Sequence, residues 1–415
     1  MTTFADSAAA VIDAHPGAGR LEAWRAFEEV GLPSSSDEVW RYTPLSALGL
    51  EDRAVPAGPS TVAPTDAARR LGAGAGVVLT VVDGYLAPVG ELPDGLEVVA
   101  DESGRSHTGQ ALYERYARDA FSLLNAALAP ATTVVRVAPG AVLPGPVVVL
   151  GLAGTGASFP RLRVEIGRGA EAVVVEYLEG GRDGLVVPVS EYALDDDGSL
   201  TLVTYQRLDE TAWQVARTTG FLERDARLRQ AVIGLGAHYD RARNDAELRG
   251  AGSANELRTT YLGRGDQVHD FRTRQLHLAP RTTSRLLSKG AVAERSRSVY
   301  TGLIEIEKGA TRTDARQTNH NLLLSSSAHA DSVPNLDIRE NDVLCAHASS
   351  VGPLDALQRW YLESRGVGRV DAQRLMIQGF FYEMLEALPA TLAAPIEADV
   401  AAAVGEVARA AEVGS

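Results

Sequence analysis

The spacing of hydrophobic residues divides the 415-residue chain into three stretches, and the first, from 1 to about 130, is predicted to be mixed and largely helical. A β-branched run at 77–82, closed by an Asp-Gly turn, predicts a strand. A further helix is expected at about 111–128, before Pro130. Apolar residues at every third position predict a helix with one buried face: Leu21, Trp24, Phe27 and Val30.

Short β-branched runs separated by glycine and small polar residues characterise the second stretch, 131–352. Repeats of roughly 20–30 residues, with no helical pattern between them, favour a β-solenoid in which successive coils stack. A β-sandwich with Gly-rich turns is the alternative. The runs lie at 134–137, 147–150, 162–166 and 172–175, and Gly followed by Ala or Ser recurs at Gly140, Gly169, Gly198, Gly250, Gly290 and Gly309, first at intervals of 29 residues and last of 19.

The third stretch, 353–415, returns to helical spacing. Pro389 and Pro395 are expected to separate an Ala-rich helix at 396–412 from two amphipathic helices before it. Short amphipathic helices at the end of a rod suit the docking of a partner or the capping of the open end of a solenoid, and both roles can hold. Their apolar stripes are Leu354, Leu357 and Tyr361, flanked by Trp360 and Leu362, and then Leu375, Met376, Gly379, Phe380, Met384 and Leu385.

An excess of acidic residues, 54 Asp and Glu against 40 Lys and Arg, gives the chain a formal charge of −14. Such a surface repels a nucleic-acid backbone and anionic membranes, so neither is an expected partner. No run reaches the ~20 apolar residues of a membrane span, and no secretory signal is visible. A single cysteine excludes an internal disulfide, and we expect a reducing, cytoplasmic compartment.

Sequence signatures of catalysis are absent, and no enzymatic activity is expected. The glycines at 72–76 precede the strand at 77–82 and do not link a strand to a helix, so they indicate a turn and not a nucleotide-binding loop. Acidic groups at 195–197, 209–210 and 305–307 could serve a carbohydrate-cleaving β-helix enzyme only if they converge in space. We favour solvated turn residues instead.

The only thiol, Cys345, is two residues from His347. Side chains two apart in a strand share one face, so both could face one iron or zinc ion. The alternative is a buried cysteine next to an incidental histidine. An iron–sulfur cluster usually takes four thiolates, so a cluster here must be shared with another subunit or completed by other ligands. The other histidines of the β region are expected to be hydrogen-bonded surface or stacked residues: His238, His269, His277, His320 and His329.

Motifs spread over the whole chain resemble one protein family. They are WRYTPL at 40–45, LNAAL at 124–128, YTGLI at 300–304, TDARQTN at 313–319, LLLS at 322–325, PNLDI at 334–338, DVLCAH at 342–347 and YLESRG at 361–366. In this order they resemble the SufB/SufD family of iron–sulfur cluster assembly proteins. The WRYTPL motif and the Cys-x-His pair are SufD-like, and no thiol lies in 317–321, the segment where SufB typically carries a cluster-assembly cysteine. The chain therefore resembles SufD most, with a SufB-like paralogue as the alternative.

The resemblance implies a right-handed parallel β-helix core with helical N-terminal and C-terminal regions, and a non-catalytic scaffold subunit of a SufBCD complex. It implies pairing with a SufB-type subunit along the β-helices and a transient iron–sulfur cluster at that interface, faced by Cys345 and His347. It also allows a homodimer of the chain alone and a reduced flavin in the complex, with no cofactor held stably by the chain alone.

The resemblance further implies that a SufC-type ATPase docks on the C-terminal helices. ATP hydrolysis in the docked ATPase would move the helical ends and thereby open or close the shared site. The implied docking residues are Trp360, Tyr361, Leu362, Arg365, Gly366, Leu375, Met376, Gly379 and Phe380.

Overall fold

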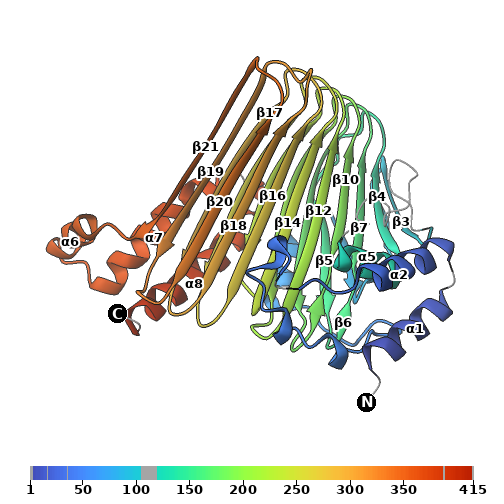
Figure 1. Cartoon of the computed structure of the whole chain (residues 1–415), viewed down its shortest axis with the longest axis horizontal. Coiled ribbons are helices and arrows are strands. Elements are labelled where there is room, and N and C mark those ends of the chain that lie inside the picture. Colours follow the sequence, from blue (N-terminus) through green and yellow to red (C-terminus); the bar gives the residue numbers. More distant parts are fainter. Residues whose placement is uncertain (1–2, 16, 35, 104–118, 387, 414–415) are drawn as a thin grey trace.

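The chain folds around a parallel β-solenoid of about eight turns, with helical regions toward both chain ends (Figure 1). The computed structural model describes residues 3–15, 17–34, 36–103, 119–386 and 388–413. The stacked coils confirm the predicted solenoid and exclude the sandwich. The helices are α1 Phe4–Ala14, α2 Ala18–Val30, α3 Asp66–Ala73, α5 Ala120–Leu128, α6 Ala356–Ser364, α7 Arg369–Leu385 and α8 Ala390–Val413, with short 3-10 helices η1 Glu38–Trp40, η2 Leu45–Ala47 and η3 Leu50–Asp52.

Two sheets form the walls of the solenoid, and apart from the antiparallel pairs β1–β2 and β3–β4 their paired strands run parallel. The ten-stranded sheet contains, in spatial order, β2 Tyr85–Leu86, β1 Val77–Val82, β5 Val147–Ala153, β8 Glu171–Gly180, β11 Ser199–Leu208, β13 Arg227–Gly234, β15 Ala254–Gly263, β17 Thr283–Val292, β19 Thr313–Leu323 and β21 Val343–Pro353. The eleven-stranded sheet contains β20 His329–Ile338, β18 Arg297–Ile306, β16 Val268–His277, β14 Tyr239–Leu248, β12 Trp213–Leu222, β10 Val189–Leu194, β7 Arg161–Ile166, β4 Thr132–Val137 and β3 Leu96–Asp101, with β9 Leu185–Val186 beside β12 and β6 Ala157–Ser158 beside β9.

The β-branched runs form the strands that the sequence predicts. The runs at 134–137, 147–150, 162–166 and 172–175 lie in β4, β5, β7 and β8. The strand predicted at 77–82 is β1, which pairs in parallel with β5. The N-terminal stretch thus contributes a strand to the wall of the solenoid.

One corner of the solenoid contains a residue in the left-handed conformation in each coil. The N–H of each donates to a carbonyl one coil further along, as Arg281 does to Thr311 and Arg312 to Asp342. Glycine adopts this conformation freely, whereas other residues do so at a cost of about 1–2 kcal/mol. The column consists of Gly140, Gly169, Asp197, Asp225, Gly252, Arg281 and Arg312, and their spacing of 27 to 31 residues is the length of one coil.

The lumen of the solenoid changes character along its axis. Alternate residues of each strand face inward, and the early coils fill the lumen with aliphatic side chains such as Val149, Val174 and Leu202. Buried polar side chains are frequent in the later coils, for example Asn255 and Gln275. The later lumen therefore depends on hydrogen bonds as well as on apolar packing.

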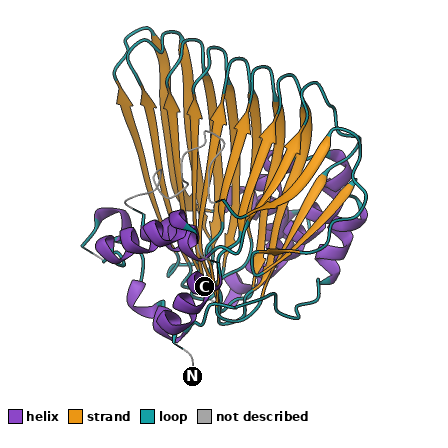
Figure 2. Cartoon of the chain, turned by 90° about the vertical axis from the view of Figure 1, so that its right-hand side faces the viewer, coloured by secondary structure: helices purple, strands orange, loops and turns teal. Residues whose placement is uncertain are grey.

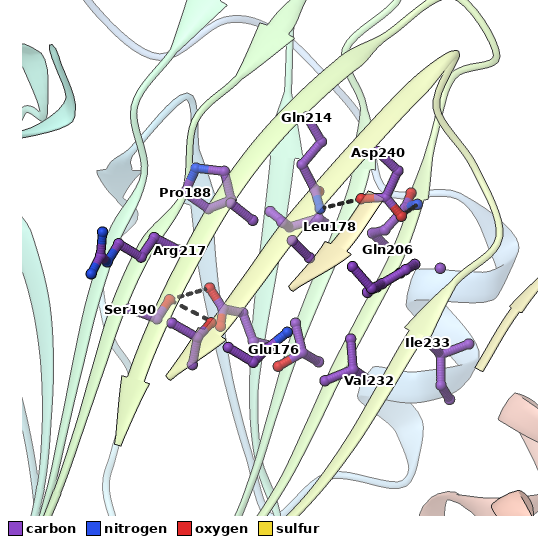
Figure 3. Close-up of a pocket in the computed structure, with 17 residues that line it drawn as sticks. Glu176, Leu178, Pro188, Ser190, Gln206, Gln214, Arg217, Val232, Ile233 and Asp240 are labelled. Atoms are coloured by element: carbon purple, nitrogen blue, oxygen red, sulfur yellow. Dashed lines mark hydrogen bonds between the residues drawn. The ribbon is translucent and has the colours of Figure 1, made fainter. Parts of the chain in front are cut away.

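A cavity of about 20 Å³ lies in the lumen where these two parts meet (Figure 3). Ser190 and Tyr192 donate hydrogen bonds to the Glu176 carboxyl group, and Gln214 donates to Asp240. Burial raises the pKa of Glu176. A space of this size holds about one water molecule, so it is not a substrate pocket.

The C-terminal helices and α3 cover the outer face of the ten-stranded sheet, while the other N-terminal helices lie on the other side of the strands (Figure 2). Apolar side chains of α7 and α8 pack on β8, β11, β13 and β15. Asp399 of α8 accepts a 2.9 Å hydrogen bond from the Tyr205 hydroxyl group. It also forms ion pairs with Arg207 at 3.3 Å and Arg70 at 3.4 Å. One largely buried carboxylate thus fastens α8 to the sheet.

The N-terminal helices other than α3 pack on the outer face of the eleven-stranded sheet. Thr43 shares a 2.6 Å hydrogen bond with Tyr239, and the Arg241 guanidinium lies 3.8 Å from the centre of the Trp40 ring. Asn125 donates hydrogen bonds to the carbonyl groups of Pro160 and Val187. The WRYTPL and LNAAL motifs therefore contain residues that attach this region to the solenoid.

Two details predicted from the sequence are wrong, namely the buried face of α2 and the position of Gly290. In α2, Leu21 and Val30 are exposed, whereas Arg20 and Ala23 are buried, because only one side of this helix faces α5 and the sheet. Gly290 lies inside β17 and not between strands. The helix expected at 111–128 is described from Ala120, and its earlier part lies outside the described residues.

In the C-terminal region, Leu354 precedes α6, and the buried face of α7 contains Ile377, Phe381 and Met384, whereas Leu375 is exposed. Pro395 does not end a helix but lies inside α8. The continuous apolar stripe of α8 outweighs the one backbone hydrogen bond that a proline removes. The buried residues of this stripe are Leu392, Ile396, Val400, Val404 and Val407.

Candidate functional site

The last coil, formed by β20 and β21, leaves one end of the solenoid open. β20 pairs only with β18 and β21 only with β19 in the two sheets, so each of the two strands has a free edge among the described residues. Most residues of both strands are partly or fully exposed, including those on the face that points into the lumen in earlier coils. We call these two strands the open end.

Cys345 and His347 lie on the lumen-facing side of β21, as their two-residue spacing predicts. Cys345 is in register with the buried Ala315, and His347 with the buried Gln317. The Cys345 side chain is half-buried and packs against the small apolar cluster that contains Ile304 and Ala315, while His347 is exposed. Burial, and to a lesser degree the Asp314 carboxylate, raise the pKa of the Cys345 thiol.

This pair is too small to hold a metal ion by itself. Within the described parts of the chain, no three side chains of His, Cys, Asp or Glu come together as metal ligands. The open edge of β21 lets other groups approach Cys345 and His347 from beyond the last coil. The arrangement can therefore provide two ligands of a site that a second molecule completes.

The other histidines are hydrogen-bonded or stacked, as expected, but two of them are buried in the solenoid and do not lie at its surface. His269 is fully buried and contacts Asp240 at 3.3 Å. His277 is fully buried between the hydroxyl groups of Thr282 and Ser284. The remaining contacts are those of His320 with Ser350, His329 with Asp331 and the His238 ring with Trp213.

The acidic groups considered for carbohydrate cleavage are engaged in separate ion pairs with arginines. Asp196 pairs with Arg224 at 3.1 Å in a turn, and Glu307 pairs with Arg339 at 2.7 Å. The same holds for Asp209 with Arg182, Glu210 with Arg264 and Glu305 with Arg274. These contacts support a structural role for the acidic groups.

Five of the nine residues considered for docking lie in or directly after α6, and we call residues 356–366 the arm. The other four lie in α7. No residue of the fully described α6 is buried, and Trp360 is 62% and Tyr361 53% exposed. The Arg365 guanidinium lies 5.2 Å from the centre of the Tyr361 ring. Leu362 and Met376 are partly buried, and Gly366 and Gly379 are exposed.

Phe380, by contrast, attaches α7 to the sheet, since its backbone carbonyl accepts a hydrogen bond from Lys289. Sequence reasoning did not include Leu357 and Tyr382 among the docking residues, although both are among the most exposed large apolar side chains. Tyr382 follows Leu375 by seven residues, or about two helical turns, and this spacing could have revealed it.

Comparisons with known proteins agree with the motifs. The family model for the SufBD core domain of the SUF system of FeS cluster assembly matches residues 149–380. The iron-sulfur cluster assembly protein SufD of Escherichia coli K12 is 30% identical, over 86% of each chain. An iron-sulfur cluster assembly SufBD family protein of Mycobacterium tuberculosis H37Rv is 31% identical, over 87% of this chain and 85% of that protein. SufD of Bacillus subtilis 168 is 32% identical, over 50% of this chain and 48% of its own length.

No helix in the described parts of the chain is long and apolar enough to cross a membrane. The family model covers more than half of the chain and contains both strands of the open end. The fold, the matched domain and the SufD relatives agree, and the chain belongs to the SufBD family of iron–sulfur cluster assembly proteins, in which it is SufD-like.

Proposed function

We propose that this chain is a non-catalytic scaffold subunit that builds nascent iron–sulfur clusters together with a SufB-type subunit and a SufC-type ATPase. The observation that carries the proposal is the pair Cys345 and His347 on one face of an open last coil. The cluster is cargo, formed at the interface and passed on. Cys345 and His347 supply two ligands, and the SufB-type subunit supplies the others.

The open end also supports a partner that pairs through its own strands. A free strand edge offers backbone donors and acceptors to a second chain. Apolar side chains at this end remain exposed, among them Leu344, Ile338 and Val351. A SufB-type subunit is the partner we propose here, and a second copy of this chain would use the same edge when the partner is absent.

The exposed arm supports docking of the SufC-type ATPase through α6 and the outer side of α7. Large exposed aromatic residues such as Trp360 and Tyr361 are common centres of protein interfaces. Because Lys289 of β17 donates a hydrogen bond to the Phe380 carbonyl group of α7, movement of the arm during ATP hydrolysis would act on the solenoid two strands from β21. We further propose that the complex works in the cytoplasm and with a reduced flavin, for which we assign no residue.

Co-expression with the SufB-type and SufC-type proteins of the same source tests the cluster site. Cys345→Ala and His347→Ala should leave assembly of the complex intact and lower the cluster yield, because each removes one ligand. His238→Ala is the matched control, since His238 is a partly exposed histidine before β14, away from the open end, whose ring contacts Trp213. Clusters that mature at the wild-type rate in both site variants would show that the site is wrongly assigned.

Two further experiments test the partners. Trp360→Ala and Tyr361→Ala should weaken binding of the ATPase, whereas Val142→Ala, which truncates an equally exposed apolar residue far from the arm, should not. Unchanged ATPase binding in both arm variants would contradict the docking proposal. Anaerobic reconstitution of the isolated chain should give no stable cluster; a stable one would favour a SufB-like scaffold that works alone.

A further inference from the structure

Gln317 stands out among the lumen residues next to the open end. Its side chain is 1% exposed. Neither the nitrogen nor the oxygen of its amide has a hydrogen-bond partner among the described residues. A buried amide without a partner costs about 1–3 kcal/mol, so the position demands an explanation.

The neighbours of Gln317 make an amide there more unexpected. The residues stacked beneath it in the ten-stranded sheet are Leu286 and then Leu257, and the residue stacked on its other side is His347. The two leucines are buried and apolar. A leucine at 317 would continue this column, whereas the glutamine interrupts it directly beneath the open end.

Space for the amide is provided from the opposite wall of the lumen. A Cβ atom at Gly302 would lie 2.3 Å from Nε2 of Gln317 and 2.4 Å from its Oε1. The amide therefore crosses the lumen and rests against the backbone of Gly302, where a larger residue would displace it. Two positions on different sheets thus combine to hold one amide at the floor of the open end.

We propose that Gln317 is a positioning residue whose Nε2 donates a hydrogen bond to a sulfide of the cluster that forms against Cys345 and His347. Sulfides of iron–sulfur clusters accept hydrogen bonds, and such bonds raise the reduction potential of the cluster. An amide donor carries no charge and does not titrate. It can therefore stabilise the negatively charged sulfide without adding a charge to the lumen. This inference rests on the proposed function.

The test compares Gln317→Leu with Gln230→Leu in the complex with the SufB-type and SufC-type partners and in the isolated chain. Gln230 is the matched control, because it is a buried lumen amide in β13 that donates a 2.9 Å hydrogen bond to Asn255. In the complex, Gln317→Leu should move the cluster reduction potential to a more negative value, while Gln230→Leu leaves it unchanged. In the isolated chain, Gln317→Leu should raise the midpoint of thermal unfolding, while Gln230→Leu lowers it.

The outcomes separate this inference from the function on which it rests. If Gln317→Leu leaves the potential unchanged while Cys345→Ala still lowers the cluster yield, the inference is overturned and the proposed function stands. A lower unfolding midpoint together with an unchanged potential would assign Gln317 a purely structural role. If Cys345→Ala matures clusters at the wild-type rate, the proposed function itself fails.

Discussion

His277 is predicted to make this protein sensitive to acid. Its imidazole is fully buried, with Nδ1 2.7 Å from the Thr282 hydroxyl oxygen and Nε2 3.0 Å from that of Ser284. Burial lowers the pKa of His277 from 6.5 to about 4. The folded protein thus holds the ring neutral at a pH where the unfolded chain already binds a proton.

The sign and size of the effect follow from proton linkage. Below pH 6.5 His277 binds a proton in the unfolded chain but not in the folded chain. The free energy of unfolding therefore falls as the pH falls, until the ring is also protonated in the folded state near pH 4. At about 1.4 kcal/mol for each pH unit, the full loss is about 3 kcal/mol. At pH 4.5 most of this loss, about 2.5 kcal/mol, should be present.

The assay is denaturant unfolding of wild type and His277→Gln at pH 7.5 and pH 4.5. The variant cannot take up this proton, so the loss of stability between the two pH values should be smaller by about 2.5 kcal/mol than in wild type. His329→Gln is the control, because the His329 side chain is largely exposed and reaches water in the folded protein as well. If His277→Gln loses as much stability on acidification as wild type, the reasoning from burial is refuted.

Three more predictions concern the lumen and the corner. Burial raises the pKa of Glu176 above its usual 4.5, so the folded state favours its proton and stability falls as the pH rises above 4.5; Glu176→Gln should therefore be more stable than wild type at pH 7.5, and the difference should vanish near pH 4.5 in denaturant titrations. Gly290→Ala would bring a Cβ to 1.9 Å from the buried Tyr261 ring and should lower the free energy of unfolding by at least about 1–3 kcal/mol, whereas Gly19→Ala, with open space around it, should not lower it. Arg312→Gly should raise the thermal midpoint slightly, because relief of the left-handed conformation at φ 57°, about 1–2 kcal/mol, exceeds the entropic cost of glycine, about 0.5–1 kcal/mol; a lower midpoint would contradict this.

The sequence predicted the solenoid best where its lumen is aliphatic. Runs such as 147–150 and 172–175 are strands because their alternate residues fill an apolar lumen. The repeat was harder to follow in later coils, since the corner position is filled by Arg281 and Arg312 as well as by glycine. Gly290 was wrongly assigned to a turn between strands. It lies inside a strand, where the absence of a side chain leaves room for the Tyr261 ring.

The candidate site was predicted only as far as strand alternation reaches. Residues two apart share a face, and this rule correctly put Cys345 and His347 together. Gln317 could not be recognised in the same way, because its significance depends on Gly302 in the opposite sheet and on the register that stacks it beneath His347. Contacts between sheets depend on how many residues each coil contains, and this number varies from coil to coil.

The stacking of coils has a consequence for how the protein folds and for where it opens locally. In the solenoid each strand pairs mainly with strands one coil away, so folding can spread from coil to coil, and each coil is held by its two neighbours. The last coil has only one such neighbour. Its amide protons should therefore exchange with solvent faster than those of the strands in the middle of the solenoid. Cys345 and His347 therefore lie in the part of the solenoid that opens most readily, and a bound partner would act as the missing next coil and slow that exchange.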